Sequence, residues 1–352
     1  MMKRIGKDQS NGTVVDLLAL TEYVDRFPTK TVVVLGDFVA DAFQTGDITR
    51  VSREAPVLIL RHRETEIVPG GGANAANNFV ALGAKVTPIT AVGDDEVGRH
   101  LISKFQEKKV NVGGIVRVPG WTTPTKTRFM AGWAHTVGQQ VLRVDYEPST
   151  ELPDAARKKL RQSLLAKIGN ADALAISDYG FGVATPHEAR QANAHMKKDI
   201  PVTLDSRYRL HEYKRAGITA ATPNEAEMET LHHTAIGKNL TELQRCGEAT
   251  CKEMKLRSLL VTRGRDGMTL FQPGRVPIHI AVHGSDQAVD VTGAGDTVLA
   301  TYTLALTCGA SPLEAAHLAN IAGGLVVMKR GTATVSQYEL LEAIRLAASE
   351  KS

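Results

Sequence analysis

The heptapeptide D-V-T-G-A-G-D at residues 290–296 places two glycines beside two carboxylates, a combination that could support group transfer. It directly precedes a long run of good helix formers. Backbone N–H groups of a glycine turn at a helix N-terminus form an anion hole, here from Gly293, Ala294 and Gly295. Asp296 would face the same point and could take the proton from an attacking hydroxyl. The alternative is an ordinary helix that begins at an Asp cap.

A second glycine-rich segment, P-G-G-G-A-N-A-A-N-N, lies at residues 69–78. Its three consecutive glycines allow a ligand to approach the backbone closely. The following segment, up to Leu82, is expected to be helical and would place Asn74 and Asn78 on one face. Their amides donate and accept hydrogen bonds, which suits sugar hydroxyls, although a tight turn with an Asn cap is the simpler interpretation of the glycines alone. The segment lacks the G-x-G-x-x-G spacing of dinucleotide sites.

A third constellation, T-P-N-E-A-E at residues 222–227, places Asn224 three residues before Glu227. This spacing is typical of a helix cap with a carboxylate at the third position. The functional alternative is a site for magnesium and phosphate groups, which the spacing alone does not favour over the cap.

The elements that must position these residues alternate along most of the chain. The expected strands are residues 31–37, 173–178, 202–205, 220–224, 258–264 and 268–271. The expected helices are residues 13–27, 153–168, 186–197, 240–255 and 296–308. Such alternation predicts an α/β fold with a mostly parallel central sheet flanked by helices. Asp37 would lie where the first strand opens into a loop, at the edge where ligands bind in open sheets.

Two further groups, residues 46–68 and 125–145, consist of short, partly alternating strands without an intervening helix. We expect them to form a small inserted β-sheet, a lid, within a single domain over residues 1–352.

The bulk composition predicts a packed core rather than disorder: of 352 residues, 43% are hydrophobic and 23% are charged. The net charge of +4 and the absence of long basic runs argue against nucleic acid as a partner. No stretch of eighteen apolar residues predicts a membrane span, and the N-terminus does not resemble a signal peptide. The three cysteines cannot all pair within one chain, so we expect a cytoplasmic location.

Taken together, these motifs resemble the PfkB (ribokinase-like) family of sugar kinases. The first signature of that family is similar to G-G-G-A-N-A-A at 70–76, followed by Gly83 and Gly93 at the family's spacing. The second is similar to D-V-T-G-A-G-D. The resemblance covers about Val32 to Leu346 and implies a ribokinase-like fold, ATP and Mg²⁺ as cofactors, and K⁺ as a further cation.

The resemblance also implies roles by position. Asp296 would be the catalytic base, and Gly293, Ala294 and Gly295 the anion hole. The expected acceptor-side residues are Asp37, Gly71, Gly72, Asn74, Asn78 and Arg128. Those expected on the nucleotide side are Asn224, Glu227, Arg207, Thr262, Gly264, Gly267 and Asn320, with Glu227 holding Mg²⁺ through water. A monovalent cation is expected near Asp290, Gly331 and Ser336.

Within the family, three segments resemble the heptose-7-phosphate kinases of the lipopolysaccharide pathway: residues 46–57, 139–147 and 177–182. This likeness implies D-glycero-D-manno-heptose 7-phosphate as an acceptor, converted to the 1,7-bisphosphate. Bifunctional members carry a nucleotidyltransferase domain with an H-x-G-H motif, which does not occur here, so we expect the kinase half alone.

Two positions depart from the pattern of that branch. Phe181 replaces the lysine of D-Y-A-K-G, and Arg207 replaces the lysine of D-P-K while keeping its positive charge. The group that binds the acceptor's phosphate is therefore open. Lys126, Arg128 and Arg143 on the inserted sheet are candidates, although solvated charges on an alternating strand explain them equally well.

The inserted sheet is also expected to expose apolar residues, with Val57, Ile59, Phe129 and Trp133 as candidates, and to form a homodimer. The leading hypothesis is an ATP-dependent kinase that acts on a hydroxyl of a sugar or sugar phosphate. The alternatives are a kinase for another sugar, a fructose phosphate or a polyol, and a sugar- or nucleotide-binding protein without catalysis.

Overall fold

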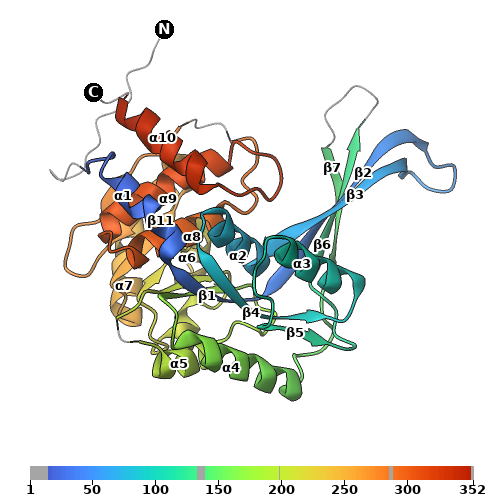
Figure 1. Cartoon of the computed structure of the whole chain (residues 1–352). Coiled ribbons are helices and arrows are strands. Elements are labelled where there is room, and N and C mark those ends of the chain that lie inside the picture. Colours follow the sequence, from blue (N-terminus) through green and yellow to red (C-terminus); the bar gives the residue numbers. More distant parts are fainter. Residues whose placement is uncertain (1–14, 133–138, 198, 285–287, 350–352) are drawn as a thin grey trace, which may run out of the picture.

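The computed structural model describes residues 15–132, 139–197, 199–284 and 288–349, which fold around a large sheet (Figure 1). Within these residues the strand order is β13-β12-β11-β10-β9-β8-β1-β4-β5. All neighbouring strands are parallel except β11–β12 and β12–β13, which are antiparallel. The bounds are β1 (Thr31–Gly36), β4 (Lys85–Gly93), β5 (Ile115–Val118), β8 (Ala173–Asp178), β9 (Val202–Ser206), β10 (Ala220–Ala221), β11 (Ser258–Thr262), β12 (Met268–Phe271) and β13 (Ile278–Ile280). The prediction of a mostly parallel sheet is confirmed.

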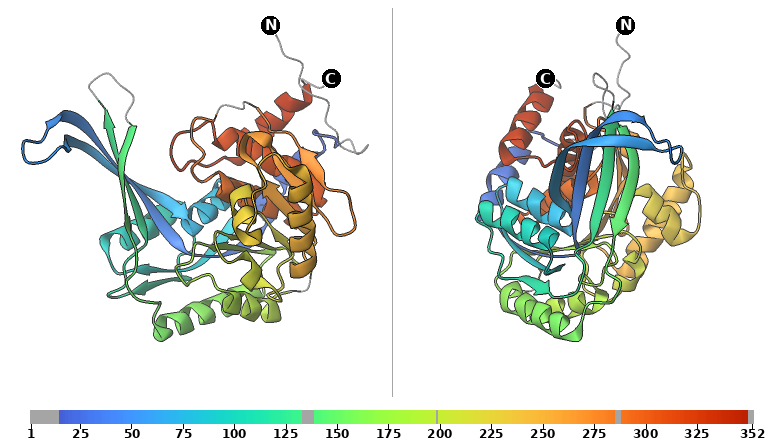
Figure 2. Two further views of the ribbon diagram at one scale, coloured as in Figure 1. Left: turned by 180° about the vertical axis from the view of Figure 1, so that it is seen from behind. Right: turned by 90° about the vertical axis from the view of Figure 1, so that its right-hand side faces the viewer.

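Helices cover both faces of this sheet (Figure 2). Val32 and Val34 pack into the core under one layer, while Val33 and Leu35 pack into the other, as alternation along a strand requires. The first layer contains α1 (Leu20–Asp25), α2 (Gly72–Ala81), α3 (Glu96–Glu107), α8 (Ala294–Thr307), α9 (Pro312–Val326) and α10 (Gln337–Ser349). The second contains α4 (Asp154–Ile168), α5 (Pro186–His195), α6 (Glu225–His232) and α7 (Leu240–Met254).

A separate four-stranded sheet projects from the body, in the order β3-β2-β6-β7 (Figures 1 and 2). Its strands are β2 (Phe38–Val51), β3 (Leu58–Gly71), β6 (Thr125–Gly132) and β7 (Gln139–Tyr146). We call this sheet the arm. The sequence suggested three short strands over 46–68, but the chain forms one long antiparallel hairpin instead. Strand β2 begins at Phe38, eight residues before the predicted start. At Gly46 its register shifts, which interrupts the alternation of the sequence without ending the pairing with β3.

Other differences concern the ends of elements. The helix expected over 13–27 is only Leu20–Asp25 followed by a 3-10 turn at Phe27–Thr29, and residues 13 and 14 lie outside the described part. The strand expected over 220–224 is reduced to Ala220–Ala221, because Pro223 cannot donate to a sheet ladder. Strands β4 and β5 were not recognised from the sequence. Among the described helices, none is long and apolar enough to cross a bilayer.

Candidate active site

The glycine loop before α8 has the geometry of an anion-binding turn. Gly293 is the residue before the helix, and its left-handed φ of 78° favours glycine. The Asp290 carboxylate shapes the loop by accepting the N–H groups of Thr292 and Gly331, both at 2.9 Å. The helix begins at Ala294, so Asp296 is not the cap and lies in the first turn with its side chain free for another role.

Asp296 is a buried carboxylate with only 2% of its surface exposed. Its Oδ2 accepts a hydrogen bond from Asn74 Nδ2 at 2.8 Å, and its Oδ1 accepts one from the Tyr179 hydroxyl at 3.4 Å. Burial raises its pKa to about 7, against the lowering effect of these two donors. A group with that pKa is half ionised near neutral pH, as a general base requires.

Helix α2 supports this carboxylate from behind. Asn74 and Asn78 lie on one face of the helix as expected, and Asn78 Nδ2 donates to the Asn74 carbonyl at 3.0 Å. Asn78 Oδ1 accepts from the hydroxyl of Thr297 on α8 at 2.8 Å. Both amides therefore bind α8, and their geometry fits positioning of the base better than contact with a sugar.

The glycines that open α2 serve close packing of the backbone. A side chain at Gly71 would collide with Val39, and Gly71 also has a positive φ of 51°. A side chain at Gly72 would collide with the backbone of Gly36 on β1, and its N–H donates to the Asp37 carbonyl at 2.9 Å. These contacts hold the N-terminus of α2 against the end of β1.

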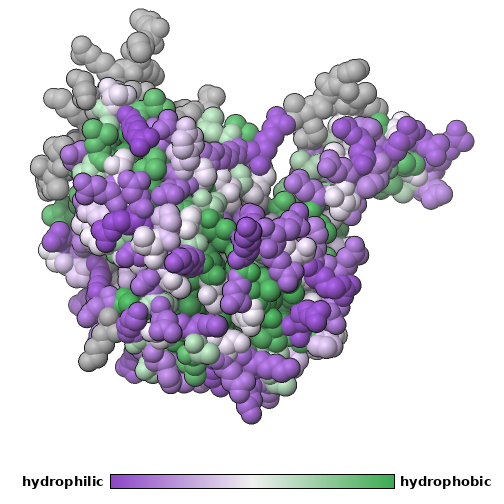
Figure 3. Space-filling model, viewed as in Figure 1, coloured by the Kyte–Doolittle hydropathy of each residue, from purple (hydrophilic) through white to green (hydrophobic). Residues whose placement is uncertain are grey.

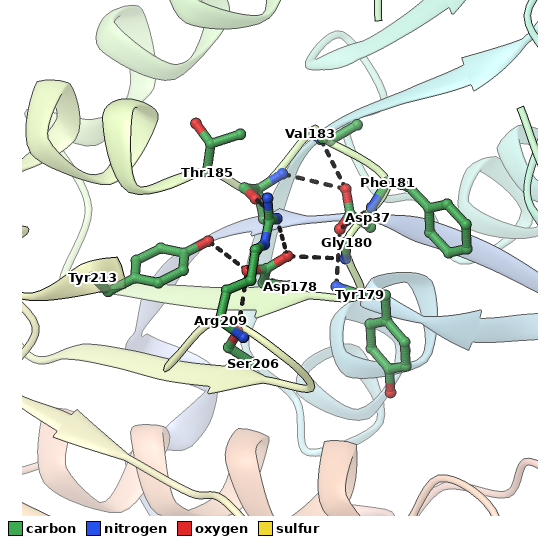
Figure 4. A network of polar contacts seen from close by, with 12 residues as sticks. Asp37, Asp178, Tyr179, Gly180, Phe181, Val183, Thr185, Ser206, Arg209 and Tyr213 are labelled. Atoms are coloured by element: carbon green, nitrogen blue, oxygen red, sulfur yellow. Dashed lines mark hydrogen bonds and ion pairs between the residues drawn. The ribbon is translucent and has the colours of Figure 1, made fainter. Parts of the chain in front are cut away.

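Asp37 does not face the space where an acceptor would bind. Its Oδ2 accepts the N–H groups of Tyr179 and Phe181 at 2.8 and 3.1 Å, and its Oδ1 accepts those of Val183 and Ala184 at 2.8 and 3.3 Å (Figure 4). The predicted sugar contact is thus a fully buried anchor for the loop after β8. Burial, together with the nearby Asp178, raises its pKa to about 6.

A neighbouring cluster fixes the other side of the same loop. Asp178 forms an ion pair with Arg209 at 2.5 Å and accepts hydrogen bonds from Tyr213 at 3.0 Å and Ser206 at 3.1 Å (Figure 4). Together with Asp37, this cluster holds the loop of residues 178–184 in place from both sides.

Asp41, which the sequence did not single out, acts electrostatically on Asp296. Its carboxylate pairs with Arg128 at 2.5 Å and accepts the hydroxyl of Thr332 at 3.1 Å. Its charge also contributes to the raised pKa of Asp296. Arg128 is therefore engaged with Asp41 and is not a free cation. The strand pattern from Phe38 onward would have revealed Asp41, since it lies on the buried part of β2.

Between the arm and the loop after β8 lies a basic hollow of about 810 Å³. Five basic residues line it, against three acidic ones; the basic ones are Lys126, Arg143, Arg157, Arg207 and Arg209, and the acidic ones are Asp145, Glu147 and Glu151. The aromatic residues Tyr179, Phe181 and Tyr208 line it as well. Arg143 is paired with Asp145, and Arg209 with Asp178. Lys126 and Arg207 have no carboxylate within ion-pair distance in the described part of the chain. Phe181, which replaces the lysine of the related kinases, lines the same space.

A second hollow, of about 260 Å³, adjoins the first at Tyr179 and Arg207 and contains the carboxylates. Asp205, Glu227 and Asp296 line it together with Asn224, Thr262, Gly293 and Gly295. Burial raises the pKa of Glu227 to about 7, and burial with the charge of Glu227 raises that of Asp205 well above its usual range. The expected capping box is present: Asn224 N–H donates to Glu227 and Glu227 N–H donates to Asn224 Oδ1, both at 2.9 Å. The cap is therefore present, and Asn224 and Glu227 line the carboxylate hollow as well.

A third, mostly apolar hollow of about 390 Å³ adjoins the second at Gly295. The predicted nucleotide residues Thr262, Gly264, Gly267 and Asn320 all line it, as do Met268, Val282, Ala288, Val291, Val298 and Val327. Asn320 Nδ2 donates to the Ala281 carbonyl at 2.7 Å, which fixes the orientation of its amide. Three connected hollows thus lie in a row along the carboxyl ends of the strands.

The three residues expected at a monovalent cation are only partly brought together. Gly331 N–H binds Asp290, as described above, but Ser336 caps α10 through hydrogen bonds with Glu339. The Ser336 hydroxyl therefore donates to the Glu339 carboxylate and accepts the Glu339 N–H, whereas Asp290 binds the loop before α8.

A buried carboxylate at a helix N-terminus, in a hollow that adjoins a basic and an apolar hollow, is the arrangement expected of an α/β small-molecule kinase. The comparisons agree with this class. The family model for pfkB family carbohydrate kinases matches residues 29–338, and the chain belongs to that family.

A curated relative, the bifunctional protein HldE of Geobacter sulfurreducens, is 38% identical over 312 residues, which cover 88% of this chain. The match spans 62% of the length of that relative. Among solved structures, a mutant of phosphofructokinase-2 from Escherichia coli has a TM-score of 0.71 at 18% identity, covering 91% of this chain and 99% of that one. Ribokinase of Arabidopsis thaliana, complexed with ribose and ATP, has a TM-score of 0.69 at 21% identity, covering 90% and 99%. These structures share the fold.

Proposed function

We propose that the chain transfers the γ-phosphoryl group of ATP to a hydroxyl of D-glycero-D-manno-heptose 7-phosphate, giving the 1,7-bisphosphate and ADP. The observation that carries the proposal is Asp296, a buried carboxylate with a pKa of about 7, in the first turn of a helix whose glycine loop can bind an anion. The acceptor oxygen forms a bond to the γ-phosphorus as the bond to ADP breaks, and the acceptor's proton passes to Asp296.

The loop of Gly293, Ala294 and Gly295 would stabilise charge on the phosphoryl oxygens during transfer. Backbone N–H groups at a helix N-terminus are preorganised, so they need no rearrangement when the charge develops. Asn74 supports this loop as well as the base, because a side chain on Gly293 would collide with its amide. Helix α2 thus sets the distance between the loop and Asp296.

The carboxylate hollow fits a magnesium ion. Magnesium is usually held by one or two carboxylates together with phosphate oxygens and waters. Asp205 and Glu227 supply such a pair, and the described residues contain no group of three or more acidic, histidine or cysteine side chains that could enclose a metal alone. When bound, Mg²⁺ neutralises phosphate charge, and Asn224 and Thr262 in the same hollow would orient the phosphates.

The apolar hollow fits the adenine ring, and Arg207, which lines both the carboxylate hollow and the basic hollow, fits the triphosphate. The opposite, basic hollow would hold the phosphate of the acceptor. Lys126 and Arg207 have free charges there, whereas Arg128 and Arg143 are neutralised by their partners. Lys126 and Arg207 therefore compensate for the lysine that Phe181 replaces.

The arm would close over the acceptor and also join two copies of the chain. Its apolar side chains Val51, Val57, Leu58, Val141, Leu142 and Tyr146 are exposed. Of the residues expected there, Val57 is exposed, Ile59 and Phe129 are partly buried, and Trp133 lies outside the described residues. In Figure 3 hydrophobic residues of the arm lie among hydrophilic ones. A second copy is the proposed occupant, because strand pairing or stacking between identical arms would cover this set. A monomer in light scattering at assay concentration would contradict this.

The decisive experiment compares wild type with Asp296→Asn on a panel of heptose, hexose and pentose phosphates, with fructose 6-phosphate and free sugars included. We expect ATP-dependent turnover that is highest on the heptose phosphate and falls at least 100-fold in the variant. Turnover of a different acceptor would redirect the proposal to that sugar. Binding of a sugar without turnover by wild type would favour a non-catalytic protein. Repeating the assay with K⁺ replaced by tetramethylammonium tests the cation expected near Asp290.

A further inference from the structure

Tyr179 forms the partition between the two hollows where acceptor and phosphates would meet. Its ring lines both the basic hollow and the carboxylate hollow. The position of its backbone is fixed, because its N–H donates to the buried Asp37 carboxylate at 2.8 Å. Its hydroxyl donates to Asp296 Oδ1 at 3.4 Å, and burial raises its pKa well above the usual range, so it remains a donor at neutral pH.

Both oxygens of Asp296 therefore have donors when no acceptor is bound. Oδ2 accepts a short hydrogen bond from Asn74, at 2.8 Å, while the bond from Tyr179 to Oδ1 is long. An acceptor hydroxyl must reach one of these oxygens before it can lose its proton. The longer bond is the weaker one, so Oδ1 is the oxygen that becomes available.

The same ring also contacts the arm. The ammonium of Lys126 on β6 lies over the Tyr179 ring, 5.1 Å from its centroid, at a distance where the ring face attracts a cation. Lys126 has no carboxylate partner among the described residues. An anionic acceptor that attracts Lys126 would withdraw this cation from the ring and loosen the side chain that covers Oδ1.

We propose that Tyr179 is a positioning residue that occupies the place of the acceptor hydroxyl at Asp296 and so suppresses hydrolysis of ATP until an acceptor displaces it. This inference rests on the proposed kinase function. In the suppressed reaction a water oxygen attacks the γ-phosphorus as the bond to ADP breaks, and the water's proton passes to the Asp296 carboxylate. A phenol hydroxyl on Oδ1 denies that water its hydrogen-bond acceptor.

The charges that surround Asp296 do not replace this donor. Asp41 on β2 and Asp205 on β9 are carboxylates, and Lys126 on β6 is the cation that acts on it from the arm. Removing the Tyr179 hydroxyl therefore leaves Oδ1 without a donor and raises the pKa of Asp296.

The test compares wild type, Tyr179→Phe and Tyr302→Phe. Tyr302 is a fully buried tyrosine on α8, whereas Tyr179 is half-buried, and the Tyr302 hydroxyl donates to Ser258 at 2.8 Å, so its variant loses the same atom away from Asp296. Release of ADP from MgATP is measured without acceptor and with it, across pH 5.5 to 9.5, and thermal melts check folding. We expect Tyr179→Phe to raise the ratio of ATP hydrolysis to phosphoryl transfer at least threefold. The acid limb of the pH–rate profile should move to higher pH by about 0.5 to 1 pH unit. Tyr302→Phe should match wild type.

Two results would overturn the inference: an unchanged ratio of hydrolysis to transfer in Tyr179→Phe, or an equal change in Tyr302→Phe. If the whole acceptor panel is inactive, the rate of ADP release without acceptor replaces this ratio, and no increase of that rate in Tyr179→Phe would overturn the inference. Inactivity on the panel would instead count against the proposed function.

Discussion

The hydrogen bond from Asn74 to Asp296 should set the pH at which the enzyme gains its base. In Asn74→Ala, Oδ2 loses a donor at 2.8 Å, and the pKa of Asp296 must rise because that donor stabilises the ionised form. A hydrogen bond to a charged group contributes about 1.5 to 3 kcal/mol, which corresponds to roughly 1 to 2 pKa units. From about 7, the pKa would move to roughly 8 to 9.

The assay is kcat/KM for the acceptor against pH at saturating MgATP. At pH 7 about half of Asp296 is ionised in wild type but only about 1 to 10% in the variant, so the rate should fall about 5- to 50-fold there. The loss should diminish as the pH rises through the new pKa. Thr297→Val is the matched control, since it removes the hydrogen bond from α8 to Asn78 on α2 and leaves the contacts of Asn74 in place. A loss of kcat/KM that is equal at every pH, with the acid limb of the pH–rate profile unmoved, would refute the reasoning.

Four further outcomes are expected. Glu227→Gln should raise the Mg²⁺ concentration for half-maximal activity by about tenfold with little change in acceptor KM, as a magnesium titration would reveal. Binding of MgATP should release protons from the carboxylates whose pKa burial raises, Glu227 and Asp205, so calorimetric heats should vary with the ionisation enthalpy of the buffer. Lys126→Met should raise KM about 10- to 100-fold for a phosphorylated acceptor but not for a free sugar; equal effects on both would exclude a phosphate contact. Asp37→Asn should lower the free energy of unfolding by about 2 to 4 kcal/mol in urea titrations, because its amide group meets backbone donors.

Local sequence patterns were sufficient to predict those features of the site that depend on backbone geometry within one short segment. The loop before α8 and the capping box of Asn224 and Glu227 were both predicted, because glycine and cap residues specify short-range structure. The residues expected at the nucleotide also line one hollow together. The alternation of strands and helices likewise indicated a mostly parallel sheet flanked by helices, although it missed strands β4, β5 and β13 and helices α3, α9 and α10.

Side-chain direction across the fold was not predictable in the same way. Asp37 and Asp41 lie four residues apart at the start of the arm, yet one binds the loop after β8 and the other faces the site. That Asp37 rather than Asp41 binds this loop depends on the position of residues 179–184, which lie more than a hundred positions further along the chain. Tyr179 and Asp205 were missed as site residues for the same reason, since a tyrosine or aspartate after a strand has no local mark of its partners.

The continuity of β2 has a mechanical consequence. One strand of 14 residues runs from the core at Phe38 to the outer part of the arm at Val51, a length of about 46 Å at about 3.3 Å per residue. If the arm pivoted by about 5° at its inner end, its tip would sweep about 4 Å while Asp41 would shift by less than about 1 Å. A small rotation of the arm therefore moves its tip several times further than the residues at its inner end. In the proposed kinase the arm would open for exchange of substrate and product while the Asp41–Arg128 pair stays in place.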